Sequence, residues 1–242
     1  MKTLFVAWQD PDSRHWLAVA RLTRRANRYY FTYTHGATLS SKFTPFGPMS
    51  DLHSTYESNE LFPLFTDRLL GRNRPEYEDY LGWLNMPTSS SLDPFDELGR
   101  TGGIRATDSL VVYPCPEPQS DGTYSLSFFS HGIRYLPKES QQFVGSLDTG
   151  RSLFLMLDNQ NEVDSLAVAM RTEPPMIVGY VPRYYANDFR SLTEGKLAGA
   201  VKLWVEKVNL DAPIQLRLLC AIKAPWPESF SPCASEQYTP LA

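Results

Sequence analysis

Short runs of apolar residues, alternating with polar ones or rich in β-branched side chains, dominate the chain and predict strands more often than helices. At the N-terminal end, three such runs are separated by Asp-Pro-Asp and Arg-Ala-Asn, which are typical turn sequences. These runs are residues 3–8, 15–22 and 28–34. We expect them to form a small antiparallel meander.

Helical spacing follows the meander. Leu61, Phe65 and Leu69 recur at i, i+4 and i+8 and predict a helix over residues 58–70. A second segment begins with proline and predicts a helix over 75–84, and a short helix is expected over 92–98 before a glycine-rich turn. We place the end of a first module, residues 1–106, just after that turn.

The second half of the chain is again β-type. Tyr124, Leu126 and Phe128 alternate with serines, which is the period of a strand with one buried face. One helix is expected near residues 183–192 and another after Pro137. The expected strands are 109–113, 123–134, 152–157, 166–170, 176–181, 201–208 and 214–223.

Many short strands with few helices favour a closed or nearly closed β-barrel over residues 107–224. The remaining segment, 225–242, contains several prolines and serines, and we expect an extended, partly disordered tail. The predicted fold class is therefore α+β, with a mainly-β second domain preceded by a smaller module of strands and helices.

Charge limits the possible partners. The apolar fraction of 42% is ordinary for a folded soluble protein, and the net charge is −4. Residues 123–242 contain 11 Lys and Arg residues against 12 Asp and Glu residues, so this half is close to neutral. A protein that coats nucleic acid by bulk electrostatics is normally basic, so any nucleic-acid contact here must be local.

The remaining composition argues for a cytoplasmic protein without metal or cofactor. The first apolar run is interrupted too soon for a signal peptide, and no run approaches 18 apolar residues, so no membrane association is expected. Cys115, Cys220 and Cys233 lack the spacing of a metal site, and we interpret them as reduced thiols.

Three segments carry the most specific pattern: His131–Leu136, Leu157–Val168 and Gly179–Arg183. The first holds an Arg-Tyr pair, the second has the form DxxNxxDxxAV, and the third reads Gly-Tyr-Val-Pro-Arg. In their order and spacing these segments resemble HIRAN domains. In fork-remodelling translocases that carry one, this domain captures single-stranded DNA at its free 3′ end, and the resemblance implies the same ligand here.

The resemblance assigns roles to five DNA-binding candidates. Tyr135 corresponds to a ring that stacks on the terminal base, and Arg134 to a phosphate contact. Asp164 matches the carboxylate that meets the terminal sugar. Tyr180 lies where related domains place a ring or polar group near the nucleotide, and Arg183 takes the basic position at the start of a helix.

Two positions depart from the family pattern, and each candidate has a structural alternative. Leu136 replaces an aromatic residue and Ser165 replaces a basic one, which removes a stacking and a phosphate contact. The Asp and Asn side chains of the second segment are also typical of tight turns. The two tyrosines are equally compatible with a barrel wall, and Arg183 with a solvated surface position.

Residues 1–85 resemble the small N-terminal subdomain of HipA-type Ser/Thr kinases. The resemblance rests on Val19–Leu22, Phe31–Tyr33 and Leu61–Leu70. It implies a partner, because a similar piece acts as a separate antitoxin subunit in split systems. No kinase core follows in the sequence, so phosphoryl transfer is not expected.

The sequence thus favours a non-enzymatic protein that binds single-stranded DNA or DNA ends. The alternative is a regulatory, antitoxin-like subunit of a separately encoded HipA-like kinase. A third alternative, a hydrolase, stays open because catalytic groups on loops need no recognisable motif, although no histidine accompanies a nucleophile motif.

Overall fold

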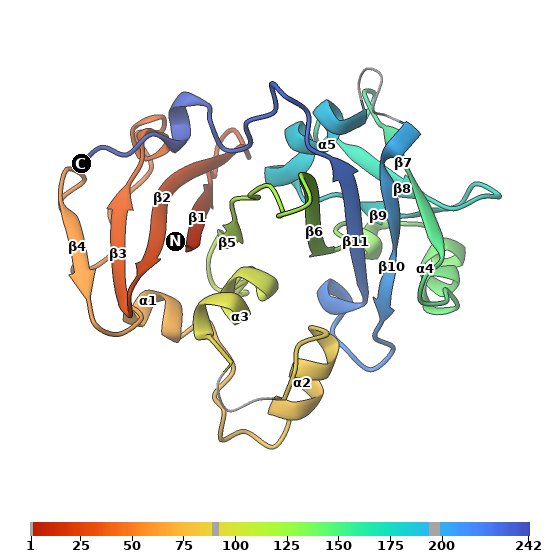
Figure 1. The fold of residues 1–242 in the computed structure, drawn as a ribbon, viewed down its shortest axis with the longest axis horizontal. Helices are drawn as coiled ribbons and strands as arrows, with labels where there is room; N and C mark the ends of the chain where they lie inside the picture. The colour runs from red at the N-terminus through yellow and green to blue at the C-terminus, as the bar shows by residue number, and fades with distance from the viewer. Residues whose placement is uncertain (1, 89–91, 194–198) are drawn as a thin grey trace. The chain divides into compact units, whose positions relative to one another are not determined.

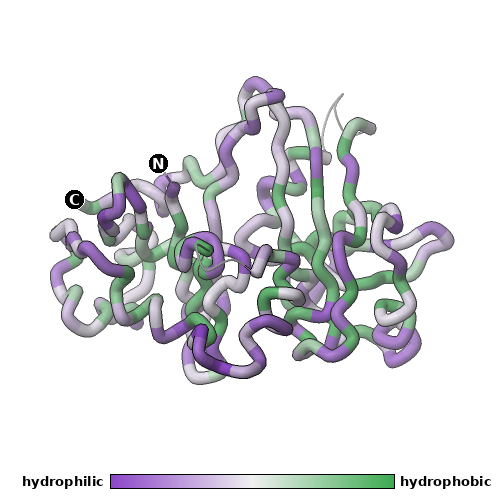
Figure 2. The backbone as a smooth tube through the Cα atoms, turned by 60° about the horizontal axis from the view of Figure 1, so that its bottom comes forward, coloured by the Kyte–Doolittle hydropathy of each residue, from purple (hydrophilic) through white to green (hydrophobic). Residues whose placement is uncertain are grey.

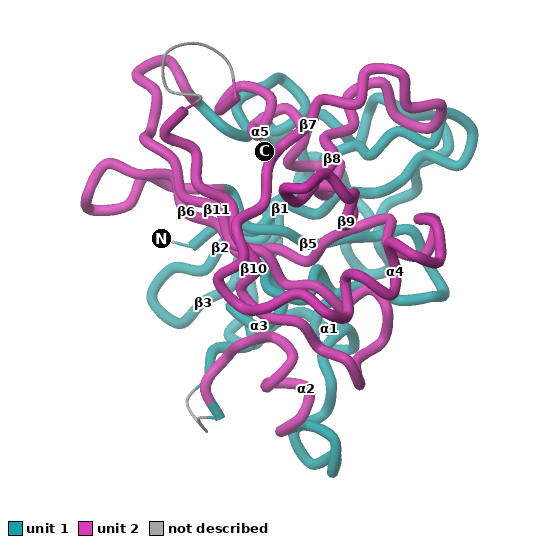
Figure 3. The backbone as a smooth tube through the Cα atoms, turned by 90° about the vertical axis from the view of Figure 1, so that its right-hand side faces the viewer, with its two compact units in different colours: residues 1–77, 88–115, 231–242 teal, residues 78–87, 116–230 magenta. Residues whose placement is uncertain are grey.

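Two compact units make up the chain in a computed structural model, which describes residues 2–88, 92–193 and 199–242. Unit 1 comprises residues 1–77, 88–115 and 231–242, and unit 2 comprises residues 78–87 and 116–230 (Figure 3). Each unit is built on its own antiparallel sheet (Figure 1). The expected α+β class, with strands dominating the second half, is confirmed.

Unit 1 is built on a five-stranded sheet in the order β4-β3-β2-β1-β5. The expected meander is confirmed and is extended by one strand at each edge. The strands are β1 (Lys2–Gln9), β2 (Trp16–Arg25), β3 (Arg28–Tyr33), β4 (Thr55–Ser58) and β5 (Leu110–Pro114).

The turn between β2 and β3 illustrates how the sequence sets the register. Ala26 and Asn27 both have positive φ, 43° and 67°, which matches the twist of a two-residue hairpin. Arg25 then pairs with Arg28, and Phe31 falls opposite Leu22 on the buried face. The core of unit 1 forms around fully buried rings such as Phe31 and Phe65.

Short helices complete unit 1: η1 (His35–Thr38), α1 (Pro63–Thr66), α3 (Pro94–Thr101) and η6 (Glu236–Tyr238). The sequence marks both ends of α3. At its start, the Asp93 side chain caps the helix by accepting a hydrogen bond from the Phe95 N–H at 3.0 Å. Gly102, with φ of 73°, ends the helix in the left-handed conformation.

Unit 2 is built on a six-stranded sheet in the order β6-β11-β10-β7-β8-β9. Hydrophobic residues concentrate in its strands, whereas connecting loops are largely hydrophilic (Figure 2). The strands are β6 (Thr123–Phe129), β7 (Ser152–Leu157), β8 (Val168–Arg171), β9 (Ile177–Tyr180), β10 (Lys202–Val208) and β11 (Leu218–Pro225).

This sheet curls until its two edges meet. His131, just after β6, forms an isolated bridge with Tyr180 of β9, through two backbone hydrogen bonds of 2.9 Å. Gly179 permits β9 to lie this close to the residues after β6. A Cβ at this position would lie 1.8 Å from the Ser130 hydroxyl, and the φ of 138° disfavours other residue types. The sheet is therefore curled like a barrel wall, and its edge segments are joined by the His131–Tyr180 bridge and by a 3.3 Å hydrogen bond from the Ser130 hydroxyl to the Val178 carbonyl.

Helices in unit 2 are short: α2 (Tyr77–Trp83), η2 (Ile133–Tyr135), α4 (Lys138–Gly145), η3 (Arg183–Tyr185), α5 (Ala186–Thr193) and η5 (Ile214–Leu216). The segment around α2 is bound to the end of β10. The Asn209 amide donates to the Trp83 carbonyl at 2.9 Å, and the Lys207 ammonium donates to the Gly82 carbonyl.

Several expected elements differ from those observed. The predicted helix over 58–70 is wrong in extent: β4 ends at Ser58, and only residues 63–66 are α-helical. The strand expected over 214–223 begins at Leu218, after a 3₁₀ turn, and extends to Pro225.

Two segments near the predicted domain boundaries pack in unit 1. β5 follows the boundary predicted at residue 106 and pairs with β1. Residues 231–242, within the tail predicted as extended, also belong to unit 1. There the Leu241 N–H donates to the Tyr33 carbonyl at 3.0 Å, and the ring of Tyr238 packs 4.7 Å from that of Phe5.

Candidate nucleic-acid interface

The Arg-Tyr pair lies on η2, directly after the bridge that joins the edges of the unit 2 sheet. Gly132 starts this turn with a φ of 75°, and its carbonyl accepts the Tyr135 N–H at 2.9 Å. The side chain of Tyr135 points into solvent and is 75% exposed. A large aromatic ring held this far out on an ordered turn is available for stacking.

Arg134 stacks on its neighbour. Its guanidinium carbon lies 4.6 Å from the centre of the Tyr135 ring, and the guanidinium also donates a hydrogen bond to the Tyr135 hydroxyl. A cation over the ring face and a bond to the ring's polar tip restrict the orientation of both side chains. The two candidates therefore form one positively charged, aromatic projection.

Tyr180 connects this projection to the acidic turn. A Cβ on Gly132 would lie 3.1 Å from the Tyr180 ring, so the ring packs directly against the start of η2. The Tyr180 hydroxyl donates to the Asp158 carboxylate at 3.2 Å. Burial, followed by the negative charge of Asp158, raises the pKa of Tyr180.

The turn between β7 and β8 is ordered by its Asp and Asn side chains. The Asn161 side-chain oxygen accepts the N–H groups of Val163 and Asp164 at 3.0 and 3.1 Å, and the Asn161 amide donates to Asp158 at 2.9 Å. Asp164 accepts the Leu166 N–H at 3.0 Å. These are the bonds that Asx residues make in tight turns, and they fix the position of the Asp164 carboxylate.

Arg183 is an ion-pair partner of Asp164. Its Nε lies 3.0 Å from Asp164 Oδ2, and its side chain also donates to the Val163 carbonyl. Both charged side chains are about three-quarters buried, with 27% and 21% of their area exposed. Arg183 therefore holds the turn and offsets the carboxylate's charge, in addition to any contact it makes with a ligand.

The five predicted residues thus lie in one contiguous region of unit 2. Tyr180, Asp158, Asn161, Asp164 and Arg183 are linked by side-chain bonds, as described above. Arg134 and Tyr135 join them through Gly132, which packs against Tyr180, and through the backbone bridge of His131. Sequence reasoning placed these residues as separate motifs, and the curled sheet brings the motifs together.

Other side chains of unit 2 extend this region. Arg190 of α5 donates to the Asn159 side chain at 2.8 Å and adds a cation beside the turn. On the strands next to the turn, the Arg171 guanidinium lies 5.2 Å from the centre of the Phe154 ring, which is 43% exposed. The two residues of this second Arg-aromatic pair lie opposite each other in the β7–β8 pairing. This pairing cannot be read from the sequence, so the pair was not predicted.

Three partly buried titratable residues lie close in sequence to this region. The rings of His131 and Tyr184 are 6.0 Å apart, and Asp188 lies four residues after Tyr184, in the first turn of α5. Burial lowers the pKa of His131 to about 4, raises the pKa of Asp188 to about 7, and raises the pKa of Tyr184. Near neutral pH, His131 and Tyr184 therefore favour their neutral forms, and Asp188 is close to the midpoint of its titration.

Neither a cluster of metal-ligating side chains nor a helix long and apolar enough to cross a membrane occurs within residues 2–88, 92–193 and 199–242. In these ranges, His, Cys, Asp and Glu side chains do not gather in groups of three or more suited to a metal ion. Helices in the same ranges are too short or too polar to cross a membrane.

A family model matches the part of the chain that contains this region. Residues 123–225 match the HIRAN domain family. The matched HIRAN region begins with β6 and ends with β11, and it contains all five predicted contact residues.

Two solved structures are similar to this chain. A Lactobacillus plantarum protein has a TM-score of 0.32 and 18% identity, over 43% of this chain and 97% of that one. The HIRAN domain of human HLTF has a TM-score of 0.31 and 14% identity, over 44% of this chain and 81% of that one. No curated protein matches. The resemblance of residues 1–85 to a HipA-type subdomain gains no support from these comparisons.

Proposed function

We propose that the HIRAN region binds single-stranded DNA at a free 3′ end, with Tyr135 stacking on the terminal base. The exposed ring of Tyr135, held on η2 beside Arg134, is the observation that carries this proposal. A ring that stacks on a base contributes about 1–3 kcal/mol to binding. In a region with nearly balanced charge, this contribution is a large part of the total.

Asp164 is the proposed reader of the terminal sugar. Its carboxylate is positioned by the Leu166 N–H and by Arg183, and it accepts a hydrogen bond from a 3′ hydroxyl. A terminal 3′-phosphate lacks the hydroxyl donor that the carboxylate accepts, and it brings negative charge toward a carboxylate whose charge Arg183 offsets only in part, which is unfavourable. Discrimination between these two ends is the chemical signature of the proposed site.

Arginines supply the proposed phosphate contacts. Arg134 is exposed, whereas Arg183 is shared with Asp164, and Arg190 lies beyond the turn. Each phosphate that a cation neutralises releases counterions and so adds to affinity. Because the site offers so few cations, it should bind only weakly to the middle of a strand. Specificity for the end must then come from stacking and the terminal hydroxyl.

Fluorescence polarisation with 5′-labelled oligonucleotides tests the proposal. A strand ending in a 3′ hydroxyl should bind, a 3′-phosphorylated strand should bind more weakly, and Tyr135→Ala should reduce affinity about tenfold. Tyr30→Ala is the matched control, because Tyr30 also has an arginine over its ring but lies in unit 1. Equal binding of wild type and Tyr135→Ala contradicts the proposal.

A further inference from the structure

Unit 1 contains a pocket apart from the HIRAN region, between the β4 end of its sheet, the loop at residues 44–49 and the start of α1. Its volume of about 680 Å³ falls in the range of about 300–1,000 Å³ typical of small-molecule sites. Every lining residue belongs to unit 1. The pocket is therefore independent of the DNA end proposed for unit 2.

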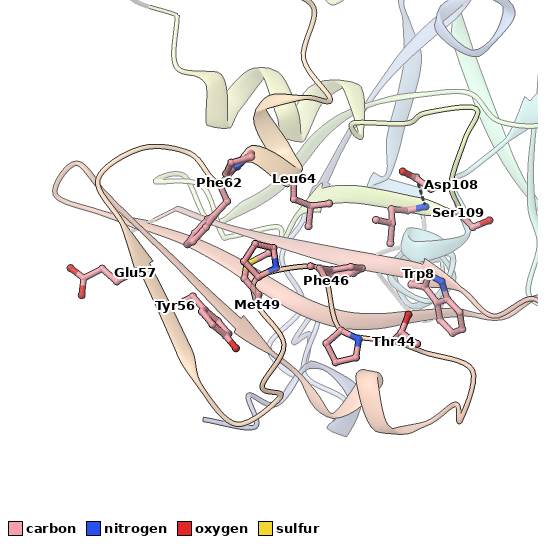
Figure 4. Close-up of a pocket in the computed structure, with 15 residues that line it drawn as sticks. Trp8, Thr44, Phe46, Met49, Tyr56, Glu57, Phe62, Leu64, Asp108 and Ser109 are labelled. Carbon is pink, nitrogen blue, oxygen red and sulfur yellow. Dashed lines mark hydrogen bonds between the residues drawn. The ribbon is translucent and has the colours of Figure 1, made fainter.

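Large apolar side chains form the middle of the pocket. In the view of Figure 4, Phe62 and Leu64 lie above Phe46 and Met49. Several lining side chains pack against the core of unit 1 and keep part of their surface accessible: Trp8, Phe46, Tyr56, Phe62 and Leu64. Accessible apolar surface gathered in one hollow favours a ligand that covers it with apolar surface of its own.

Buried hydrogen bonds hold the loop at residues 44–49 in place. The hydroxyl of Tyr33, a fully buried residue, accepts the Phe46 N–H at 2.6 Å and donates to the Met49 carbonyl at 2.7 Å. The Met49 N–H donates in turn to the Phe46 carbonyl at 2.9 Å. Because the loop is fixed from its core side, the pocket is preformed, and a ligand loses little affinity to ordering it.

Both charged side chains of the lining are already paired. Glu57 is bonded to Arg28 on the face of β4 opposite Tyr56, and it extends away from the pocket (Figure 4). Both oxygens of Asp108 accept hydrogen bonds from Arg68, at 3.1 and 2.5 Å. A charged ligand would therefore lose its hydration here without gaining a free counter-charge, which is unfavourable.

Uncharged polar groups lie at one end of the pocket. Figure 4 shows Trp8, Thr44 and Ser109 toward the same end, and these side chains carry an indole N–H and two hydroxyls. We propose that the pocket binds a small uncharged ligand, with an aromatic ring between Phe46 and Phe62 and a neutral hydrogen-bonding group at the Trp8 end. A few polar groups in an otherwise apolar pocket fix the orientation of such a ligand.

Three probes of similar shape and different charge test this preference: 3-phenylpropanamide, 3-phenylpropionate and 3-phenylpropylamine. Binding to the full chain is followed by ¹H–¹⁵N NMR, through the Trp8 indole and the Leu110 amide. The amide should give saturable shifts at the lining residues, and the charged acid and amine should bind at least about tenfold more weakly at neutral pH. Absence of saturable shifts, or an acid or amine that binds as tightly as the amide, overturns the proposal.

Variants assign the effect to the pocket. Leu64→Trp should fill it and abolish binding of the amide. Thr44→Val keeps the side-chain shape and removes a hydroxyl, so it should lower amide affinity about fivefold. Because Thr44 is exposed, this variant keeps the test valid if Leu64→Trp does not fold. Unchanged amide affinity in Thr44→Val overturns the placement of the polar group.

Glu57→Gln is the matched control for charge. The carboxylate is paired and extends away from the pocket, so the variant should leave the affinities for all three probes unchanged. A loss of amine affinity in Glu57→Gln would show that this carboxylate meets the ligand, and it would overturn the preference for an uncharged one.

Discussion

Arg183 and Asp164 form an ion pair, with 3.0 Å between Nε and Oδ2, across the turn that carries the proposed sugar contact. A second bond from Arg183 to the Val163 carbonyl anchors the same turn. We predict that Arg183→Ala lowers the free energy of unfolding by about 1–2 kcal/mol, because a part-buried carboxylate loses its partner.

Urea unfolding measures this change, and DNA binding supplies a second readout. Arg183→Lys keeps the charge but cannot reproduce both bonds, so it should recover little of the stability. If Lys restores full stability and affinity, Arg183 acts only through its charge.

Gly132 links the exposed projection to Tyr180. Substitution by alanine places a Cβ 3.1 Å from the Tyr180 ring at a φ of 75°, so we predict a loss of about 1–3 kcal/mol in stability together with weaker DNA binding. Gly122→Ala is the matched control: its φ is 73°, but no atom lies within 4 Å of its Cβ position. Equal losses of stability in the two variants would show that the ring contact contributes nothing.

The hydrophobic pattern predicted most strands, because alternation and turn chemistry are local. The exceptions depend on distant partners. Thr55–Ser58 is too short and polar to stand out, and it is a strand because it pairs with β3. β5 was expected as a strand over 109–113, but its pairing with β1, about a hundred residues earlier, was not, because residue spacing does not indicate which strands will pair.

The candidate site shows the same limit. The three motifs were visible in the sequence, and so was the capacity of Asn161 and Asp164 to order a turn. The pairing of Arg183 with Asp164 was not predictable, because either side chain equally fits a ligand contact or a solvated position. The contact of Gly132 with Tyr180 requires the sheet to curl, and only the three-dimensional structure supplies it.

Asp188 gives a prediction about pH. Burial raises its pKa from 3.8 to about 7, so the folded protein keeps this proton over a range where the unfolded chain has lost it. The free energy of unfolding should therefore fall as pH rises from about 4 to about 7, by on the order of 1.4 kcal/mol per unit of pKa shift.

Asp188→Asn should remove this fall, and the variant should be more stable than wild type at pH 8 but not at pH 4. Thermal or urea unfolding across the pH range measures the difference. Asp211→Asn, at an exposed position of unit 2, should leave the pH profile unchanged. If the free energy of unfolding of the wild type rises between pH 4 and pH 7 as steeply as that of Asp188→Asn, the raised pKa of Asp188 is contradicted.

Salt dependence follows from the small number of arginines. With Arg134 and Arg183 as the proposed phosphate contacts, the logarithm of the association constant should fall with the logarithm of salt concentration with a slope of about −1 to −2. Titrations at several salt concentrations measure this slope. A slope of −5 or steeper, on the scale of many phosphate contacts, would require a basic surface that the proposed site does not include.

The ratio of affinities for 3′-hydroxyl and 3′-phosphate strands tests the central claim most directly. Competition polarisation with one oligonucleotide in both forms should show at least about tenfold preference for the hydroxyl in the wild type, and Asp164→Asn should reduce this preference, because an amide does not repel a phosphate. A ratio near one in the wild type, or a ratio unchanged by Asp164→Asn, contradicts recognition of the 3′ end by this site.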